Sequence, residues 1–305
     1  MSNLFTNIIQ QEVGEKNDSA ETTIAVEANP NTSIQAFDGD EHSVTMNDGQ
    51  VDVLELKNIV LRFGDFTLFN GINFNIPDFL DEGQFITIMG GSGSGKSQLA
   101  RVISGLTKPT SGEVYMYGKR YDDNTHIPMV FQQYSSFPWM TVLDNVALPL
   151  KMKGVPKSER YAKAMETIRL VGLEGHEKKW AQYPMLSGGQ LQRVSLARNL
   201  VADSQIMILD EYSSGLDTAS KSTMQDILLE LFYDRKIDRT FIMITHDINE
   251  AVYLSQRVHL LDSKTHTFAK TVEIKFDGKR TRDIVGTSQY KAYYKEIEEF
   301  FAKTE

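Results

Sequence analysis

The fold is decided by the stretch Gln84-Phe85-Ile86-Thr87-Ile88-Met89, which runs directly into Gly90-Gly91-Ser92-Gly93-Ser94-Gly95-Lys96-Ser97. Its first half is a short apolar run, as is typical of a buried strand. Beyond the glycines, apolar residues recur between Leu99 and Leu106 at steps of three and four, which predicts a helix. A strand, a Gly-rich turn and a helix in this order indicate the start of an α/β fold that binds nucleotides.

The eight residues from Gly90 to Ser97 match G-x-x-x-x-G-K-S, the P-loop motif, between the strand and helix that the motif requires. Its glycines let several backbone N–H groups point at one phosphate, and the following helix adds its positive end. We expect Lys96 to contact the β- and γ-phosphates and the Ser97 hydroxyl to bind Mg²⁺. The alternative is a glycine-rich turn with a surface lysine, which the flanking strand and helix disfavour.

A second candidate site follows the apolar run Ile206-Met207-Ile208-Leu209, where Asp210 and Glu211 stand next to each other. The run suits a strand buried on both faces of a parallel sheet, and so does 241–244. Ligands of such sheets bind at the carboxyl ends of the strands. We therefore expect Asp210 to hold Mg²⁺ and Glu211 to polarise an attacking water. The alternative is an ordinary polar strand end.

A third motif is Leu186-Ser187-Gly188-Gly189-Gln190, far along the chain from the P-loop. Here the chain resembles the ABC ATPases, whose signature sequence is Leu-Ser-Gly-Gly-Gln. A serine and small residues that open a helix can form a second phosphate cradle, although an ordinary helix cap is the alternative. The resemblance implies that this segment closes over ATP bound to the P-loop of another copy. Two copies would then meet head to tail around two ATP–Mg²⁺.

Further positions fall where the family pattern places functional residues. The resemblance implies that Gln132 senses Mg²⁺ and the attacking water, and that His246 contacts the γ-phosphate. It implies that Asp217 lies in a loop along the dimer interface. Phe63 falls where the family has an aromatic that stacks on adenine, although a core aromatic at a strand end is the alternative.

Two positions depart from the family pattern near the nucleotide. Gln98 stands where the family usually has Thr, whose hydroxyl contacts the α-phosphate. Tyr212 stands where Pro usually follows the catalytic Glu, so the loop gains an N–H and loses a fixed φ. The complete predicted site is Glu211, His246 and Gln132 for catalysis; Ser97, Gln132 and Asp210 for Mg²⁺; and Phe63, Gly90, Gly91, Ser92, Gly93, Ser94, Gly95, Lys96, Ser97, Gln98, Ser187, Gly188, Gly189, Gln190 and Asp217 for ATP.

The segment from Phe137 to Leu150 looks like the one in importer ATPases for nitrate, sulfonates and taurine. There it helps to form a groove for a short helix of the membrane subunit. The implied partners are a second ATPase subunit, transmembrane permease subunits and, indirectly, a substrate-binding protein. Trp139 could line the groove or anchor a helical core. The alternatives are an exporter or lipid-transport ATPase, and a soluble ABC protein that acts on ribosomes or DNA.

Composition and charge divide the chain into three parts. Residues 1–52 hold ten acidic residues and one basic residue, and we expect this extension to be disordered. Residues 53–265 form the expected ATPase domain, a P-loop α/β core with an antiparallel β subdomain at its start and a helical subdomain at about 134–190. Residues 266–305 carry an amphipathic helix. The balanced charge of the domain argues against nucleic acid as a partner.

Cysteine usage and apolar runs bear on where the chain works. The 305 residues include no Cys, which fits a reducing cytoplasm. The chain lacks both a basic secretory start and a run of roughly 18 apolar residues that could span a bilayer. We therefore expect a peripheral protein at the cytoplasmic face of the membrane, with membrane work done through partner chains.

Overall fold

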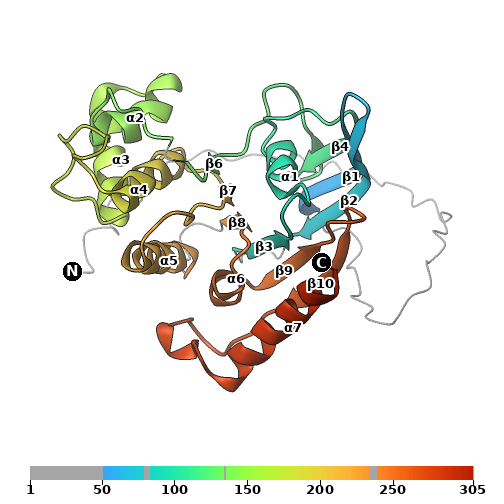
Figure 1. Cartoon of the computed structure of the whole chain (residues 1–305). Helices are drawn as coiled ribbons and strands as arrows, with labels where there is room; N and C mark the ends of the chain where they lie inside the picture. The colour runs from blue at the N-terminus through green and yellow to red at the C-terminus, as the bar shows by residue number, and fades with distance from the viewer. Residues whose placement is uncertain (1–50, 79–82, 134, 234–238, 305) are drawn as a thin grey trace, which may run out of the picture. The chain divides into compact units, whose positions relative to one another are not determined.

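The computed structural model describes residues 51–78, 83–133, 135–233 and 239–304. The acidic extension expected at residues 1–52 therefore lies almost entirely outside the described residues. From residue 51 onward the chain forms two sheets, a four-stranded antiparallel sheet and a six-stranded mainly parallel one (Figure 1). The expected α/β architecture with an antiparallel β subdomain at its start is confirmed.

The strand and helix predicted around the P-loop are both present. Strand β3 spans Phe85–Gly90 and is buried along its whole length, and helix α1 spans Lys96–Ile103. The P-loop joins them, as the apolar run and the later helical spacing predicted. A strand buried on both faces carries mainly apolar side chains, which explains why this run does not alternate between apolar and polar residues.

The six-stranded sheet carries the strands whose carboxyl ends surround the P-loop. Its order is β10-β9-β3-β8-β7-β6, parallel except for β10, which runs antiparallel to β9. The strands other than β3 are β6 Met129–Val130, β7 Ile206–Asp210, β8 Thr240–Ile244, β9 Arg257–Leu261 and β10 Phe268–Glu273. The two apolar runs predicted as buried strands are β7 and β8, which pair with each other.

The antiparallel sheet has the order β2-β1-β4-β5. Its strands are β1 Asp52–Phe63, β2 Phe66–Pro77, β4 Ser111–Met116 and β5 Lys119–Arg120. One face of β1 and β2 packs with α1 and one face of the parallel sheet in a single buried apolar cluster. This packing fixes the P-loop between the two sheets.

Helices occupy much of the region expected to be helical, between residues 134 and 190. Helix α2 spans Val142–Met152, α3 spans Lys157–Leu170, and α4 begins at Gly188 and ends at Leu200. These helices join the second apolar cluster together with β7, β8 and helix α5, Thr218–Tyr233. The segment between α3 and α4 has no helix. Gly172 and Gly175 have φ values of +65° and +83°, which a right-handed helix does not accommodate.

The C-terminal segment packs back on the domain. After α6, Ile248–Leu254, and the short helix η1, Arg282–Ile284, helix α7 spans Ser288–Thr304 and lies along α6 (Figure 1). Ile297 of α7 is fully buried in the larger cluster, and the Tyr290 hydroxyl donates a hydrogen bond to the Asn249 carbonyl at 3.0 Å.

A buried histidine in β9 makes stability depend on pH. His259 is 8% exposed, lies edge-on against Phe74 with ring centroids 4.9 Å apart, and contacts the Thr271 hydroxyl through Nδ1 at 2.9 Å. Burial, helped by the charge of Arg257, lowers the pKa of His259 from 6.5 to about 4. The folded chain therefore binds fewer protons than the unfolded chain between these values, so stability is lost as the pH falls from 6.5 towards 4.

We expect the His259→Phe variant to lose less free energy of unfolding than the wild type between pH 6.5 and pH 4.5. The expected difference is roughly 2 kcal/mol, measured by urea unfolding at each pH. His126→Gln is the matched control, since His126 is exposed. Equal pH slopes in the wild type and the His259→Phe variant would contradict this account.

Candidate active site

A cavity of about 610 Å³ gathers the P-loop and the side chains that follow β7 and β8. Its described lining is Leu68, Ser92, Gly93, Gly95, Lys96, Ser97, Gln98, Glu211 and His246. Lys96 meets Glu211 and His246 here although it is more than 100 positions from either of them, because β3, β7 and β8 lie side by side, run parallel and end at the same side of the sheet. Leu68 was not predicted, since β2 reaches the cavity only through sheet packing.

Two glycines of the P-loop occupy positions that other residues could not take easily. Gly95 has φ +95°, and a Cβ there would meet the Phe69 ring at 2.7 Å. Gly93 has φ +78° and opens onto the cavity. Both angles lie in the left-handed region that glycine enters without strain. The loop can therefore curl tightly at the N-terminal end of α1.

Lys96 is buried at the centre of the P-loop. Its Nζ donates hydrogen bonds to the Gly90 and Gly91 carbonyls at 2.8 and 2.9 Å. Burial lowers the pKa of Lys96, while the nearby carboxylates of Glu211 and Asp210 oppose that change. A buried ammonium held by two neutral carbonyls is a strong partner for an anion that enters the cavity.

Ser97 and Asp210 form a pair of oxygen donors next to the cavity. The Ser97 hydroxyl donates a hydrogen bond to Asp210 Oδ1 at 3.2 Å, and burial raises the pKa of Asp210. Mg²⁺ is commonly bound by one carboxylate together with hydroxyl, water and phosphate oxygens. The pair therefore fits that ion. Among the described residues no cluster of three or more His, Asp or Glu side chains could hold a metal ion.

Glu211 and His246 face each other across the mouth of the cavity. Their Oε1 and Nδ1 atoms lie 3.4 Å apart, and the Glu211 N–H donates to the Ile244 carbonyl at 2.9 Å. Glu211 has φ +44°, an unusual conformation for a residue other than glycine. Such a conformation costs about 1 kcal/mol or more and is concentrated at functional sites. In this conformation the Glu211 side chain lines the cavity.

The predicted residues Gln132 and Asp217 lie in two loops, which Ser214 links to each other. Gln132 Nε2 donates to the Ser214 hydroxyl at 3.1 Å, across 82 positions of sequence. Asp217 accepts hydrogen bonds from the Ser220 N–H and hydroxyl at the start of α5, which lower its pKa. Neither residue is among the described residues that line the cavity.

The signature residues cap helix α4 away from this cavity. Ser187 Oγ accepts from the Gln190 N–H at 3.2 Å, and Gln190 Oε1 accepts from the Ser187 N–H at 2.9 Å. This reciprocal capping box predicts a stable helix start. A Cβ on Gly189 would meet the Ser220 hydroxyl at 2.5 Å, so α4 approaches α5 closely. None of the four signature residues from Ser187 to Gln190 is in the described lining of the P-loop cavity.

Gln98, Phe63 and Tyr212 each occupy a defined position in the structure. Gln98 lines the cavity, where its amide is available to a ligand. Phe63 is 49% exposed at the end of β1, so the alternative of a core aromatic is wrong, although Phe63 is not in the described lining of the cavity. Tyr212 is 1% exposed in the larger core, where burial raises its pKa well above 10. The family's Pro is thus replaced by a core anchor directly after Glu211.

A buried hydrogen-bond network behind the cavity was not predicted. Glu250 is fully buried and accepts from the Thr245 hydroxyl at 2.8 Å, one residue before His246. Gln225 of α5 donates to Glu250 at 3.5 Å and accepts from Arg282 at 2.9 Å. The network therefore connects the strand end that carries His246 to the C-terminal segment. No local sequence motif predicts this network, because each of its hydrogen bonds joins residues of separate elements.

Exposed aromatic and apolar side chains gather in the segment before α2 and the loop before α4. Trp139 is 68% exposed, Tyr183 80% and Met185 52%, and Trp180 pairs through its backbone with Thr141. The alternative in which Trp139 anchors a helical core is wrong. Exposed apolar groups of this kind mark interaction sites.

Within the part of the chain that the structure describes, no helix combines the length and apolar character that crossing a bilayer requires.

The sequence matches the family model described as ABC transporter over residues 69–214. It is 39% identical over 244 residues to an uncharacterized ABC transporter ATP-binding protein of Methanocaldococcus jannaschii, covering 78% of this chain and 88% of the relative. It is 39% identical to an Fe³⁺ ions import ATP-binding protein of Escherichia coli K12, covering 71% of this chain and 61% of the relative. It is 38% identical to a nitrate import ATP-binding protein of Synechocystis, covering 67% of this chain and 76% of the relative.

The fold is similar to a dimeric bacterial ABC transporter cassette, with a TM-score of 0.63 and 32% identity over 73% of this chain and 99% of that one. A second structure of that cassette, 31% identical over the same shares of both chains and with the same TM-score, is a dimer in a post-hydrolysis state bound to ADP and Pi.

Proposed function

Because the chain belongs to the ABC transporter family and is an ATP hydrolase of that type, we propose that it energises import of a small solute as a peripheral subunit. The observation that carries this proposal is the cavity in which Lys96, Ser97, Glu211 and His246 meet. A cation and backbone N–H groups on one side and a carboxylate–histidine pair on the other suit a triphosphate and its attacking water.

Each side chain has one task in this proposal. Lys96 leaves the Gly90 and Gly91 carbonyls and contacts the β- and γ-phosphates, so a buried charge gains a charged partner. Ser97 and Asp210 hold Mg²⁺, which neutralises phosphate charge when it is bound. Glu211 orients and polarises the water, and His246, 3.4 Å from Glu211, contacts the γ-phosphate.

The nucleotide site becomes complete only with a second copy. Ser187 and its glycines form a phosphate cradle, yet they do not line the P-loop cavity of their own chain. Two copies related by a twofold axis would place each cradle over the other copy's P-loop. The dimeric cassettes with similar folds support this arrangement. ATP would then hold the dimer closed, and hydrolysis would weaken it, with Gln132 and Asp217 at the interface.

We propose a small anion such as nitrate, a sulfonate or taurine as the imported solute. The segment from Phe137 to Leu150 and the nitrate import relative support this choice. The Fe³⁺ import relative has nearly the same identity, so overall similarity does not separate the solutes. The import function of both named relatives favours import over the alternatives of an exporter and a soluble ABC protein.

The permease would dock on the exposed patch formed by Trp139, Trp180, Tyr183 and Met185. Large aromatic side chains commonly carry most of an interface's binding energy. We expect Trp139→Ala to weaken the binding of the full chain to its membrane subunits about 30-fold, measured with the purified permease in detergent. Met152→Ala is the control, because Met152 is 81% exposed at the end of α2 and outside the patch.

The permease for this measurement is first identified by purification of the chain from its native membranes and mass spectrometry. Recovery of a multi-span permease and a secreted binding protein is the expected result. Recovery of ribosomes, or of no membrane protein, would contradict the transport proposal. If the Trp139→Ala and Met152→Ala variants bound the permease with equal affinity, the proposal that the permease docks on this patch would be wrong.

A further inference from the structure

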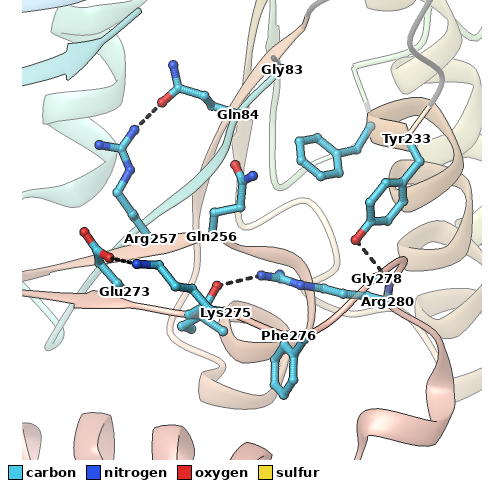
Figure 2. Close-up of a pocket in the computed structure, with 12 residues that line it drawn as sticks. Gly83, Gln84, Tyr233, Gln256, Arg257, Glu273, Lys275, Phe276, Gly278 and Arg280 are labelled. Atoms are coloured by element: carbon cyan, nitrogen blue, oxygen red, sulfur yellow. Dashed lines mark hydrogen bonds and ion pairs between the residues drawn. The ribbon is translucent and has the colours of Figure 1, made fainter. Parts of the chain in front are cut away.

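A second cavity, which we call the basal cavity, lies at the opposite end of strands β3 and β9 from the P-loop. It has a volume of about 450 Å³ and is lined by residues before β3, at the start of β9 and after β10, among them Gln84, Gln256 and Lys275 (Figure 2). The P-loop follows the other end of β3. A strand of this length separates its ends by roughly 20 Å, so the basal cavity is distinct from the nucleotide site.

The basal cavity contains a buried arginine, Arg280, whose charge is not neutralised by any carboxylate among the described residues. Arg280 is 6% exposed, and its guanidinium donates to the Tyr253 and Ile274 carbonyls at 3.3 and 3.0 Å. Within the described residues it has no carboxylate at ion-pair distance. A guanidinium has five N–H donors, so donors remain for a ligand. Burying a cation without a counter-ion is costly, and an anion in the cavity would offset that cost.

The rest of the lining combines positive charge with aromatic surface. Lys275 stands at the rim, paired with Glu273 at 2.8 Å, and its side chain is 81% exposed. The Tyr233 ring and the Phe276 ring flank Arg280, whose guanidinium carbon lies 5.5 Å from the Phe276 centroid (Figure 2). Together with Arg257, the described lining has three cationic side chains and one carboxylate. Apolar walls with a few convergent polar groups are typical of small-molecule sites.

We propose that the basal cavity binds a small organic anion with a flat apolar body. Its carboxylate or phosphate would contact Arg280 and Lys275, and its ring would lie against the aromatic wall formed by Phe232, Tyr233 and Phe276. A guanidinium binds such planar or branched oxyanions with paired hydrogen bonds. This site goes beyond the proposed transport function, because it contacts neither the nucleotide cavity nor the Trp139 patch.

The test is calorimetric titration of the full chain with phenyl phosphate, with the nucleotide site kept saturated by ADP and Mg²⁺. We expect one site per chain, at least tenfold weaker binding of inorganic phosphate, and no binding of phenol at the same concentrations. Inorganic phosphate that binds as tightly as phenyl phosphate would overturn the aromatic part of the proposal. Absence of phenyl phosphate binding up to about 10 mM would overturn all of it.

Two variants locate the site. Arg280→Gln should weaken phenyl phosphate binding at least tenfold, but Arg280 also holds two backbone carbonyls. Lys275→Gln avoids that difficulty and should weaken binding about fivefold, as expected for a largely solvated charge at the rim. Lys270→Gln is the matched control, since Lys270 is also a lysine of this region paired with a glutamate, Glu296, but outside the cavity. Equal affinities of the Lys275→Gln and Lys270→Gln variants would contradict the proposal.

Because these titrations need neither hydrolysis nor a permease, their failure would leave the transport proposal standing. Failure of the transport proposal would likewise leave the binding result unchanged.

Discussion

Replacing Glu211 by Gln is expected to lower ATP turnover about 10²- to 10⁴-fold while ATP binding stays within about twofold of the wild type. The amide keeps the shape of the side chain and its place 3.4 Å from His246, but it cannot polarise a water as a carboxylate does. Turnover is measured as phosphate release at saturating ATP–Mg²⁺, and binding by fluorescence of a nucleotide analogue.

Glu174→Gln is a suitable control for the Glu211 variant, because Glu174 is an exposed glutamate that forms an ion pair with Arg169 on the surface. Its turnover should equal that of the wild type. Turnover of the Glu211→Gln variant within threefold of the wild type would contradict a role of Glu211 in polarising the attacking water. Loss of ATP binding would instead place Glu211 among the residues that hold the nucleotide.

Replacing Lys96 by Ala is expected to weaken ATP binding at least about 100-fold and to abolish measurable turnover. Lys96 is the buried cation of the P-loop, and charge-assisted hydrogen bonds contribute about 1.5 to 3 kcal/mol each. The variant also frees the Gly90 and Gly91 carbonyls, which Lys96 bonds in the absence of a nucleotide. Binding is measured by titration with ATP–Mg²⁺ at constant ionic strength.

Lys108→Ala is the control for the Lys96 variant, because Lys108 is an exposed lysine paired on the surface with Asp123. Its ATP affinity should not change. A loss of affinity in Lys96→Ala accompanied by a lower free energy of unfolding would be ambiguous, so urea unfolding is measured in parallel. Unchanged affinity in a folded Lys96→Ala variant would contradict the P-loop assignment.

The sequence predicted those parts of the fold that depend on neighbouring residues. The apolar run before Gly90, the runs at 206–209 and 241–244, and the helical stripe near the C-terminus all correspond to observed elements. Each forms because its own side chains need burial on a particular face. The P-loop, Glu211 and His246 were also brought to one cavity, because parallel strands end at the same edge.

The parts that the sequence did not reveal depend on contacts between distant elements. Leu68 reaches the nucleotide cavity only because the antiparallel sheet packs on α1. The bonds between Thr245, Glu250, Gln225 and Arg282 join four separate segments, and no spacing rule predicts them. The exposure of Trp139 was undecided from sequence, because an aromatic residue fits a core and an interface equally well.

The central claim is that ATP is enclosed between the P-loop of one copy and the Ser187 segment of another. The most direct test is the sedimentation of the Glu211→Gln variant with ATP–Mg²⁺, compared with a variant that also carries Ser187→Arg. The account predicts dimers that retain two ATP in the first case, and monomers that still bind ATP in the second. Monomers of the Glu211→Gln variant saturated with ATP, or equal dimerisation with and without the arginine, would contradict it.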